Sequence, residues 1–315
     1  MREKARIAFV FPGQGSQYVG MGKELCREFA AAREVFEEAD QALGFPLSGL
    51  CFSGPEEELK LTKHAQPAIL TASIAALRAL ESARPMTPVC VAGHSLGEYS
   101  SLVSAGAISF TDAVKIVHER GKLMQDAVPP GEGAMAAVVG LPTEAVEAIC
   151  REAAQGEVVT LAGLNGAEQL VIAGARGAVL RAVALAEERG AKRAVELPMS
   201  APFHCPLMMP AAEGLRKVLD GVAIQPYSTP VITNVEAAVN LNPARVKSLL
   251  VEQVTRPVRW EESVKEMEGL GCQQVLELGP GKVLTGLVKR ISRALKTHNL
   301  DAPKDLEKFL IQAAA

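Results

Sequence analysis

The stretch VCVAGHSLGEYSSLVSAGAI, residues 89–108, joins a short β-branched run, a glycine-rich turn and a helix-like segment. Within it, Gly93, Ser95 and Gly97 form the pattern G-x-S-x-G. The two glycines let the backbone turn sharply between a strand and a helix, which exposes the serine hydroxyl between them. The helix start adds a free N–H at Leu96 and a dipole that favours negative charge. We therefore predict Ser95 to be a nucleophile; the alternative is a glycine-rich turn with a solvated serine.

Strands and helices alternate on both sides of this stretch. The apolar run Ile7–Phe11 predicts a strand, and helix-like patterns follow at residues 21–43 and 65–82. After the stretch, Thr111 and Asp112 can cap a further helix. Such alternation is typical of a parallel sheet that is covered by helices on both faces, so we predict an α/β fold.

A composition break at Pro129-Pro130-Gly131 opens a second unit, residues 131–198. Residues 134–197 read as strand, helix, strand, strand, helix and strand, the split order of a ferredoxin-like unit. A length of about seventy residues suits a small inserted domain. The remaining residues, 1–130 and 199–315, are assigned to the first unit. The elements expected in its second part are strands at 231–235 and 273–278 and helices at 243–255, 261–270 and 282–295.

Composition and charge argue against several classes of partner. A net charge of −3 and an aromatic content of 4% do not suit a nucleic-acid-binding surface. No apolar stretch is long enough to span a bilayer, and the apolar run before Pro12 is too short for a signal peptide. The six cysteines lack CxxC and zinc-ligand spacing. Although an even count allows disulfides, we expect a cytoplasmic protein with free thiols, no metal site and no membrane partner.

A serine nucleophile requires a base, and histidine is the usual one. The five histidines of the chain are His64, His94, His118, His204 and His298. His94 adjoins Ser95 and, at the end of a strand, is expected to point away from it. His204 lies in the loop SAPFHCP, residues 200–206, where the chain re-enters the first unit; loops of this kind commonly carry sites. We therefore predict His204 to be the base; the alternative is an ordinary hydrogen-bonded loop histidine.

The third member of a catalytic triad is missing from the pattern. Hydrolases with this turn use the order Ser, then Asp or Glu, then His. The acids between Ser95 and His204 fall almost entirely on helices of the second unit, and none stands out at a strand end. A backbone carbonyl or an amide can hold the imidazole instead, so the site differs from an ordinary esterase triad.

The glycine turn FPGQGSQ, residues 11–17, invites a nucleotide-binding interpretation. It has Tyr18 where the dinucleotide-binding pattern G-x-G-x-x-G has its third glycine. We therefore exclude nucleotide binding and expect the exposed N–H of Gln14 to help hold an oxyanion.

Taken in order along the chain, these segments resemble the malonyl-CoA:acyl carrier protein transacylase family of type II fatty acid synthesis. Acyltransferase domains of fatty acid and polyketide synthases are relatives of that family. The segments that carry the resemblance are FPGQGSQ (11–17), GHSLGE (93–98), HERG (118–121), the Phe203-His204 loop, Gln253–Trp260 and Leu278-Gly-Pro-Gly281. The resemblance covers essentially the whole chain and implies an α/β-hydrolase-like core with a ferredoxin-like small subdomain.

The resemblance also implies a role for individual residues. Ser95 attacks the malonyl thioester, and His204 takes its proton and returns it to the leaving thiol. The N–H groups of Gln14 and Leu96 form the oxyanion hole, and the backbone carbonyl of Gln253 orients the histidine in place of the missing acid.

Three more residues are implied to bind the acyl group. Arg120 grips the free carboxylate of malonyl, which a planar guanidinium binds bidentately; the alternative is a solvated helix arginine. Asn165 lies close to the site. Phe203 resembles forms that crowd the α-carbon and favour malonyl over methylmalonyl.

The implied reaction is a ping-pong transfer from malonyl-CoA to Ser95 and then to the phosphopantetheine thiol of acyl carrier protein. The resemblance implies no metal, no bound cofactor and a monomer. Because carrier proteins are acidic, we expect a basic patch for docking, with Lys289-Arg290 and Lys192-Arg193 as candidates.

Two rival functions share some of these features. A serine thioesterase or esterase has the same turn and base, but Arg120 and the absent acid speak for a transferase. A docking or scaffold module that has lost its chemistry is the second rival, and the complete set of site residues speaks against it. Labelling of Ser95 by a serine-directed reagent separates the scaffold from both enzymes.

Overall fold

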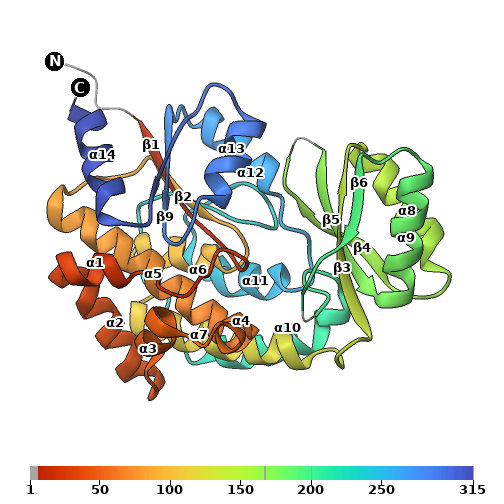
Figure 1. The fold of residues 1–315 in the computed structure, drawn as a ribbon, viewed down its shortest axis with the longest axis horizontal. Helices are drawn as coiled ribbons and strands as arrows, with labels where there is room; N and C mark the ends of the chain where they lie inside the picture. Colours follow the sequence, from red (N-terminus) through yellow and green to blue (C-terminus); the bar gives the residue numbers. More distant parts are fainter. Residues whose placement is uncertain (1–5, 167, 200, 315) are drawn as a thin grey trace.

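The computed structural model describes residues 6–166, 168–199 and 201–314, and these form a large and a small lobe (Figure 1). The large lobe is built around a six-stranded sheet in the order β10-β9-β1-β2-β7-β8. All its strand pairs are parallel except β7 with β8. Its strands are β1 (Ile7–Phe11), β2 (Cys90–Gly93), β7 (Val231–Ile232), β8 (Val239–Asn240), β9 (Gln274–Leu278) and β10 (Lys296–Leu300).

Helices cover both faces of this sheet, as the alternation in the sequence predicts. Those that precede the small lobe are α1 (Lys23–Glu28), α2 (Ala30–Leu43), α3 (Leu47–Ser53), α4 (Glu56–Lys60), α5 (Thr62–Ala83), α6 (Gly97–Ser104) and α7 (Phe110–Asp126). Those that follow it are the 3-10 turn Pro206–Met208, α10 (Met209–Asp220), α11 (Pro243–Gln253), α12 (Trp260–Gly269), α13 (Val283–Ile291) and α14 (Pro303–Ala314). None of the helices in the described residues has the length and apolar character needed to cross a membrane.

The alternation of side chains along β1 explains the two layers. Ile7, Phe9 and Phe11 belong to one buried cluster that includes residues of α2, α5 and α7. Ala8 and Val10 belong to a second cluster, on the other face, that includes residues of α12 and α13. Successive strand side chains point to opposite faces, so a fully apolar strand needs a helical layer on each side.

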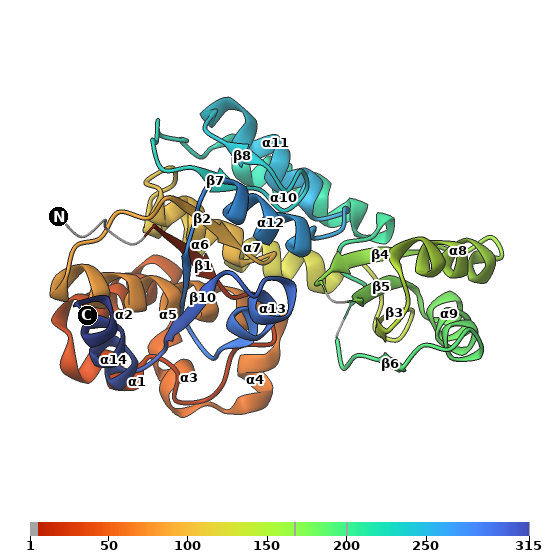
Figure 2. The ribbon, with the colours of Figure 1, turned by 90° about the horizontal axis from the view of Figure 1, so that it is seen from above.

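The small lobe contains a separate antiparallel sheet in the order β4-β5-β3-β6. Its elements are β3 (Gly133–Val139), α8 (Thr143–Ala154), β4 (Val159–Leu164), β5 (Gln169–Ala175), α9 (Arg176–Glu188) and β6 (Arg193–Glu196). Both helices lie on one face of the sheet, where they enclose their own buried cluster (Figure 2). The order of elements is the one that the sequence predicts for this region.

The lobes meet along β4, beside the carboxyl ends of the central strands. Leu164 N donates to Val258 O, and Val258 N donates to Ala162 O, which ties β4 to the segment after α11. The loop that follows β2 also points toward this junction, and in open α/β sheets ligands bind at the carboxyl ends of the strands.

Several elements of the structure were not predicted from the sequence. No element is predicted for residues 44–61, where the structure has α3 and α4, and none after residue 297, where it has most of β10 and all of α14. None is predicted either for residues 209–220 and 239–240, where the structure has α10 and β8. The strand β10 is an edge strand of sequence KTHNL, whose side chains are mostly half-buried and polar. The apolar alternation on which strand prediction rests is therefore absent from it.

Candidate active site

Ser95 occupies a strained turn between β2 and α6. Its φ is 51°, a left-handed conformation that non-glycine residues adopt only when their surroundings impose it. The glycines on either side are required by contact: a Cβ at Gly93 would lie 2.0 Å from the carbonyl of Gly97, and one at Gly97 would lie 2.0 Å from Phe11 O. The G-x-S-x-G pattern therefore marks a turn that is packed too closely for larger residues.

Asn234, just beyond β7, fastens this turn from the neighbouring strand. Its Nδ2 donates to Gly93 O at 2.6 Å, and its Oδ1 accepts from Ser95 N at 2.7 Å. The side chain is 1% exposed and thus bridges the residues before and after His94. Because β7 is parallel to β2 and next to it, a residue that follows β7 reaches the end of β2.

The Ser95 hydroxyl lies 2.7 Å from Nε2 of His204. The other ring nitrogen, Nδ1, is 2.8 Å from the backbone oxygen of Gln253. A carbonyl only accepts, so Nδ1 carries the proton and Nε2 is the acceptor for the serine hydroxyl. The pair therefore has the arrangement of a nucleophile and its general base, and the predicted partners Ser95 and His204 are brought together.

The carbonyl that holds His204 belongs to the last residue of α11. The last four carbonyls of a helix lack intrahelical partners, so Gln253 O is free to accept. This end of a helix also carries a partial negative charge, which stabilises an imidazolium as it forms. The C-terminus of α11 thus takes the position that an Asp or Glu side chain has in a catalytic triad.

Burial keeps His204 uncharged. The side chain is 6% exposed, and desolvation, followed by the positive charge of Arg120, lowers its pKa to about 3. At neutral pH the imidazole is thus able to accept a proton.

Arg120, on α7, is buried with its guanidinium against the nucleophile. Its Nη2 donates to Ser95 Oγ at 3.1 Å and to Gln253 Oε1 at 2.8 Å, and its Nη1 donates to Gln66 Oε1 at 2.7 Å. These acceptors are all neutral oxygens. The alternative of a solvated helix arginine is wrong, because the side chain is 1% exposed. No carboxylate among the residues that the structure describes forms an ion pair with Arg120, so this buried cation beside a nucleophile is suited to an anionic substrate group.

The two predicted oxyanion donors lie at the same cavity. Leu96 precedes the first residue of α6, and Gln14 lies in the glycine turn after β1. Among the described residues, neither backbone N–H has a hydrogen-bond partner in the protein. Both remain available to an oxyanion that forms beside Ser95.

The cavity has a volume of about 170 Å³ and lies between the lobes. Its polar wall includes His94, whose Nε2 is 2.9 Å from Oδ1 of Asn165. The remainder is apolar, with Phe203 and side chains from both lobes. The full lining is Gln14, Gln66, His94, Ser95, Leu96, Arg120, Met124, Met135, Ala162, Gly163, Asn165, Val171, Leu197, Met199, Phe203 and His204. Seven of the eight predicted site residues line the cavity. The eighth, Gln253, hydrogen-bonds to two of the lining residues, His204 and Arg120.

His94 corrects an expectation from the sequence. Strand alternation places it away from Ser95, but β2 ends at Gly93, so His94 already belongs to the turn and lines the same cavity. Sequence reasoning also missed Asn234, Gln66 and the buried acid Glu98. Glu98 and Gln66 adjoin recognised motifs or helix starts, whereas Asn234 carries no signal of its own.

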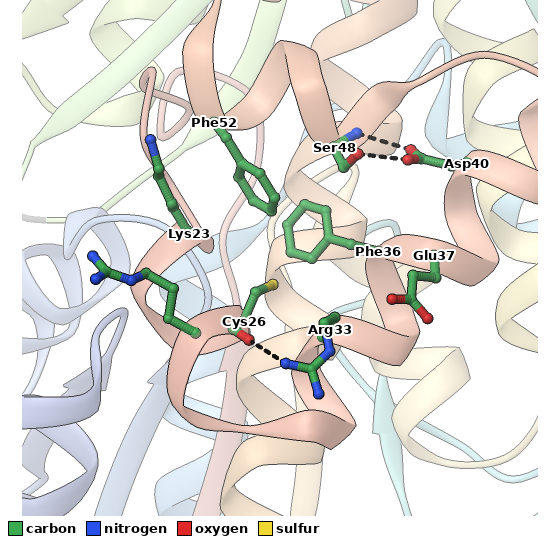
Figure 3. Close-up of a pocket in the computed structure, with 9 residues that line it drawn as sticks. Lys23, Cys26, Arg33, Phe36, Glu37, Asp40, Ser48 and Phe52 are labelled. Carbon is green, nitrogen blue, oxygen red and sulfur yellow. Dashed lines mark hydrogen bonds between the residues drawn. The ribbon is translucent and has the colours of Figure 1, made fainter.

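A second cavity, of about 600 Å³, lies between α1, α2 and α3 (Figure 3). The rings of Phe36 and Phe52 form its floor, with centroids 4.9 Å apart. On its wall, Asp40 accepts from both the backbone N–H and the hydroxyl of Ser48. It shares no lining residue with the cavity at Ser95, so the chemistry is assigned to the latter.

Comparison with known proteins gives one consistent result. The family of acyl transferase domains matches residues 8–302. Malonyl CoA-acyl carrier protein transacylase of Bacillus subtilis (strain 168) is 50% identical over 304 residues, which is 96% of each chain. The solved structure of this transacylase from Coxiella burnetii has a TM-score of 0.97 at 43% identity and covers 99% of both chains. A malonyl-transacylase solved in complex with a type II polyketide synthase acyl carrier protein has a TM-score of 0.95 at 44% identity, over 98% of this chain and 100% of that one.

Proposed function

We propose that this chain, which belongs to the acyl transferase domain family, moves a malonyl group from malonyl-CoA to the phosphopantetheine thiol of acyl carrier protein. The observation that carries the proposal is the contact of one serine hydroxyl with both a neutral histidine and a buried arginine. The histidine supplies the base for acyl transfer, and the arginine supplies the charge that distinguishes malonyl from neutral acyl groups. The product feeds fatty acid synthesis.

The first half-reaction acylates the serine. Ser95 Oγ attacks the thioester carbonyl while its proton passes to Nε2 of His204. The N–H groups of Gln14 and Leu96 stabilise the oxyanion of the tetrahedral intermediate. When the C–S bond breaks, the proton on Nε2 goes to the leaving sulfur of coenzyme A, and malonyl-Ser95 remains.

The second half-reaction reverses these steps with a different thiol. The phosphopantetheine thiol of the carrier gives its proton to His204 and attacks the acyl-serine carbonyl. Ser95 regains its proton as the new thioester departs. The cycle is a ping-pong transfer in which both substrates use one site, and we propose that it needs no metal and no bound cofactor.

Arg120 is assigned to the free carboxylate of malonyl. In the unliganded site its Nη2 donates to Ser95 Oγ, so a carboxylate bound there lies beside the reacting carbon. Phe203, 4% exposed in the cavity wall, limits the room for substituents on the α-carbon, and Asn165 completes the wall beside His94.

The Arg120→Ala variant is expected to lower kcat/KM for malonyl-CoA by about 10²–10³-fold, because a buried charge-assisted contact is lost. Transfer of acetyl, which lacks the carboxylate, should change much less. Steady-state kinetics with both thioesters measures the two values in the same protein. Arg78→Ala, which removes an exposed arginine paired with Glu81, is the control. Equal losses for malonyl and acetyl would remove the arginine from acyl recognition.

The carrier protein is assigned to the surface beside Asn165, where one residue of each basic pair contacts the start of β5 or the residue before it. Arg290 Nη2 donates to Oε1 of Gln169, the first residue of β5. Lys192 Nζ lies 3.8 Å from the carboxylate of the preceding residue, Glu168. Arg290 of α13 and Lys192, just before β6, thus contact consecutive residues, and we assign the acidic carrier to this surface.

Reversal of both pairs to glutamate is expected to raise KM for the carrier protein by about tenfold or more and to reduce the salt dependence of the transfer. The measurement is transfer from malonyl-CoA at varied carrier and salt concentrations. The control is the same reversal of Arg216-Lys217, an exposed basic pair on α10. Figure 1 shows α10 and α13 on opposite edges of the molecule. An unchanged KM in the quadruple variant would refute this docking surface.

The rival thioesterase differs in the fate of the acyl-serine. A hydrolase must activate water, whereas a transferase must keep malonyl-Ser95 intact until a thiol arrives. Intact-protein mass spectrometry after mixing with malonyl-CoA separates them: the transferase shows an adduct that leaves when carrier protein is added. Accumulation of free malonate without carrier would favour the thioesterase.

We also propose a fold type for each lobe, an oligomeric state and a cellular compartment. The large lobe, residues 1–130 with 199–315, is assigned an α/β-hydrolase-like core, and residues 131–198 a ferredoxin-like subdomain; positions 1–5, 167, 200 and 315 lie outside the described residues. The sheet order of the small lobe supports the second name. We propose a monomer in the cytoplasm, and the six buried, unpaired cysteines are in keeping with that compartment.

A further inference from the structure

Gln253 contacts the site with its side chain as well as with its backbone. The buried amide oxygen Oε1 accepts from Arg120 Nη2 at 2.8 Å. The amide nitrogen Nε2 donates to Ser95 O at 3.0 Å and to Glu98 Oε2 at 2.7 Å. The side chain is completely buried, so no solvent competes for these contacts.

The orientation of this amide is set by its neighbours. Nε2 faces two acceptors, and Oε1 faces a guanidinium that can only donate. The reverse orientation would place NH₂ against Arg120 and the amide oxygen against the carboxylate of Glu98. Glu98 is 2% exposed, and its Oε2 also accepts from Asn234 N at 3.1 Å. Because Oε2 of Glu98 already accepts from Asn234 N, it serves as an acceptor for the Gln253 amide and holds that amide in one orientation.

An amide relay affects Arg120 differently from a direct ion pair. A carboxylate in contact with the guanidinium would neutralise it and compete with the carboxylate of a substrate. The amide oxygens of Gln253 and Gln66 instead fix the position of the guanidinium and leave its charge available. Glu98 acts on Arg120 through the Gln253 amide, which hydrogen-bonds to both residues.

We propose that the Gln253 side chain and Glu98 are positioning residues that hold Arg120 ready for an acyl group with a carboxylate. They thereby help to determine selectivity for anionic over neutral acyl groups. This inference rests on the proposed function, because it concerns the same arginine and the same acyl-serine. It is separate from the contact between the Gln253 backbone and His204, which any side chain at this position retains.

The first test is Gln253→Met, which keeps the length of the side chain and the backbone carbonyl but removes all three amide contacts. The ratio of kcat/KM for malonyl-CoA to that for acetyl-CoA is expected to fall by about tenfold or more, mainly through KM for malonyl-CoA. Leu250→Met, a buried change of similar size one turn earlier on α11, is the control for disturbance of the helix. A ratio that stays at the wild-type value, or an equal loss for both thioesters, would overturn the proposal.

The second test compares two changes of Glu98. Glu98→Gln keeps an oxygen that can accept from Gln253 and Asn234, whereas Glu98→Leu removes that acceptor. The proposal predicts that the malonyl-to-acetyl ratio falls at least about tenfold further in Glu98→Leu than in Glu98→Gln. Equal ratios in the two variants would show that the acceptor does not act through the amide. If Glu98→Leu fails to fold, Gln253→Met still decides.

The two proposals fail in different ways. If the wild-type protein forms no malonyl adduct, the proposed function fails, and the positioning role that rests on it fails as well. If the wild-type protein transfers malonyl and Gln253→Met keeps the full preference, only the positioning role fails.

Discussion

The Ser95→Ala variant is expected to form no malonyl adduct and to lose transfer activity by about 10⁵-fold or more, as removal of a catalytic serine does in other acyl-transfer enzymes. Ser95 Oγ is the atom on which the histidine and the arginine converge, and the two oxyanion donors line the same cavity. Without it no covalent intermediate forms, and the small residual rate comes from binding and the oxyanion hole. Intact-protein mass spectrometry and a transfer assay measure the two losses.

The matched control for this change is a second serine nearby in the sequence. Ser100, on α6, is fully buried, and its hydroxyl has no hydrogen-bond partner among the described residues. Ser100→Ala therefore removes the same atom from the same helix region without a lost bond, and near-normal activity is expected. An adduct that persists in Ser95→Ala would place the nucleophile elsewhere. Absence of any adduct in the wild-type protein, with no malonate released, would favour the scaffold.

The fold could be predicted where tertiary packing requires particular residue types at nearby positions of the sequence. The turn between β2 and α6 needs glycines on both sides of the serine because the start of α6 lies too close to the backbones of β2 and β1 for a Cβ. This close packing is therefore visible in the sequence as the G-x-S-x-G pattern. The small lobe was predictable for a related reason. Apolar residues recur with the period of a strand along its strands and with the period of a helix along its helices. By contrast, β10 has little apolar alternation, and its position depends on pairing with β9.

The site was predictable only in part, because several of its contacts join residues that are far apart in the chain. Ser95 and His204 could be proposed from a motif and by elimination. Asn234 holds the turn from 139 positions away, and nothing in its local sequence distinguishes it from a surface asparagine. The arginine could be assigned only through the resemblance, because a helix arginine is usually solvated; here it is 1% exposed. Arg120 is buried because α7 packs against α5 and α10, and this packing is not visible in the local sequence.

The His204→Ala variant is expected to slow formation of the malonyl adduct by about 10⁴-fold or more, because the serine then lacks its general base. The ring is held at both nitrogens, by Ser95 Oγ and by the carbonyl of Gln253, so no other side chain can take its place. Rapid-mixing mass spectrometry measures the rate of adduct formation. His118→Ala is the control: its Nδ1 is 2.8 Å from Lys63 O and it does not line the cavity at Ser95, so its loss should leave acylation nearly unchanged.

The pH dependence of the same step tests the electrostatics. Burial and the charge of Arg120 lower the pKa of His204 to about 3, so the folded protein keeps the base neutral well below the ordinary histidine range. Burial raises the pKa of Glu98 to about 7, so that group already holds its proton below pH 6. Between pH 6 and 4.5 the acylation rate should therefore stay nearly constant, since the proton that inactivates His204 binds only near its depressed pKa. A histidine with an ordinary pKa would lose about twentyfold over this interval. A loss of that size in the wild-type protein would mean that His204 is hydrated in the working enzyme.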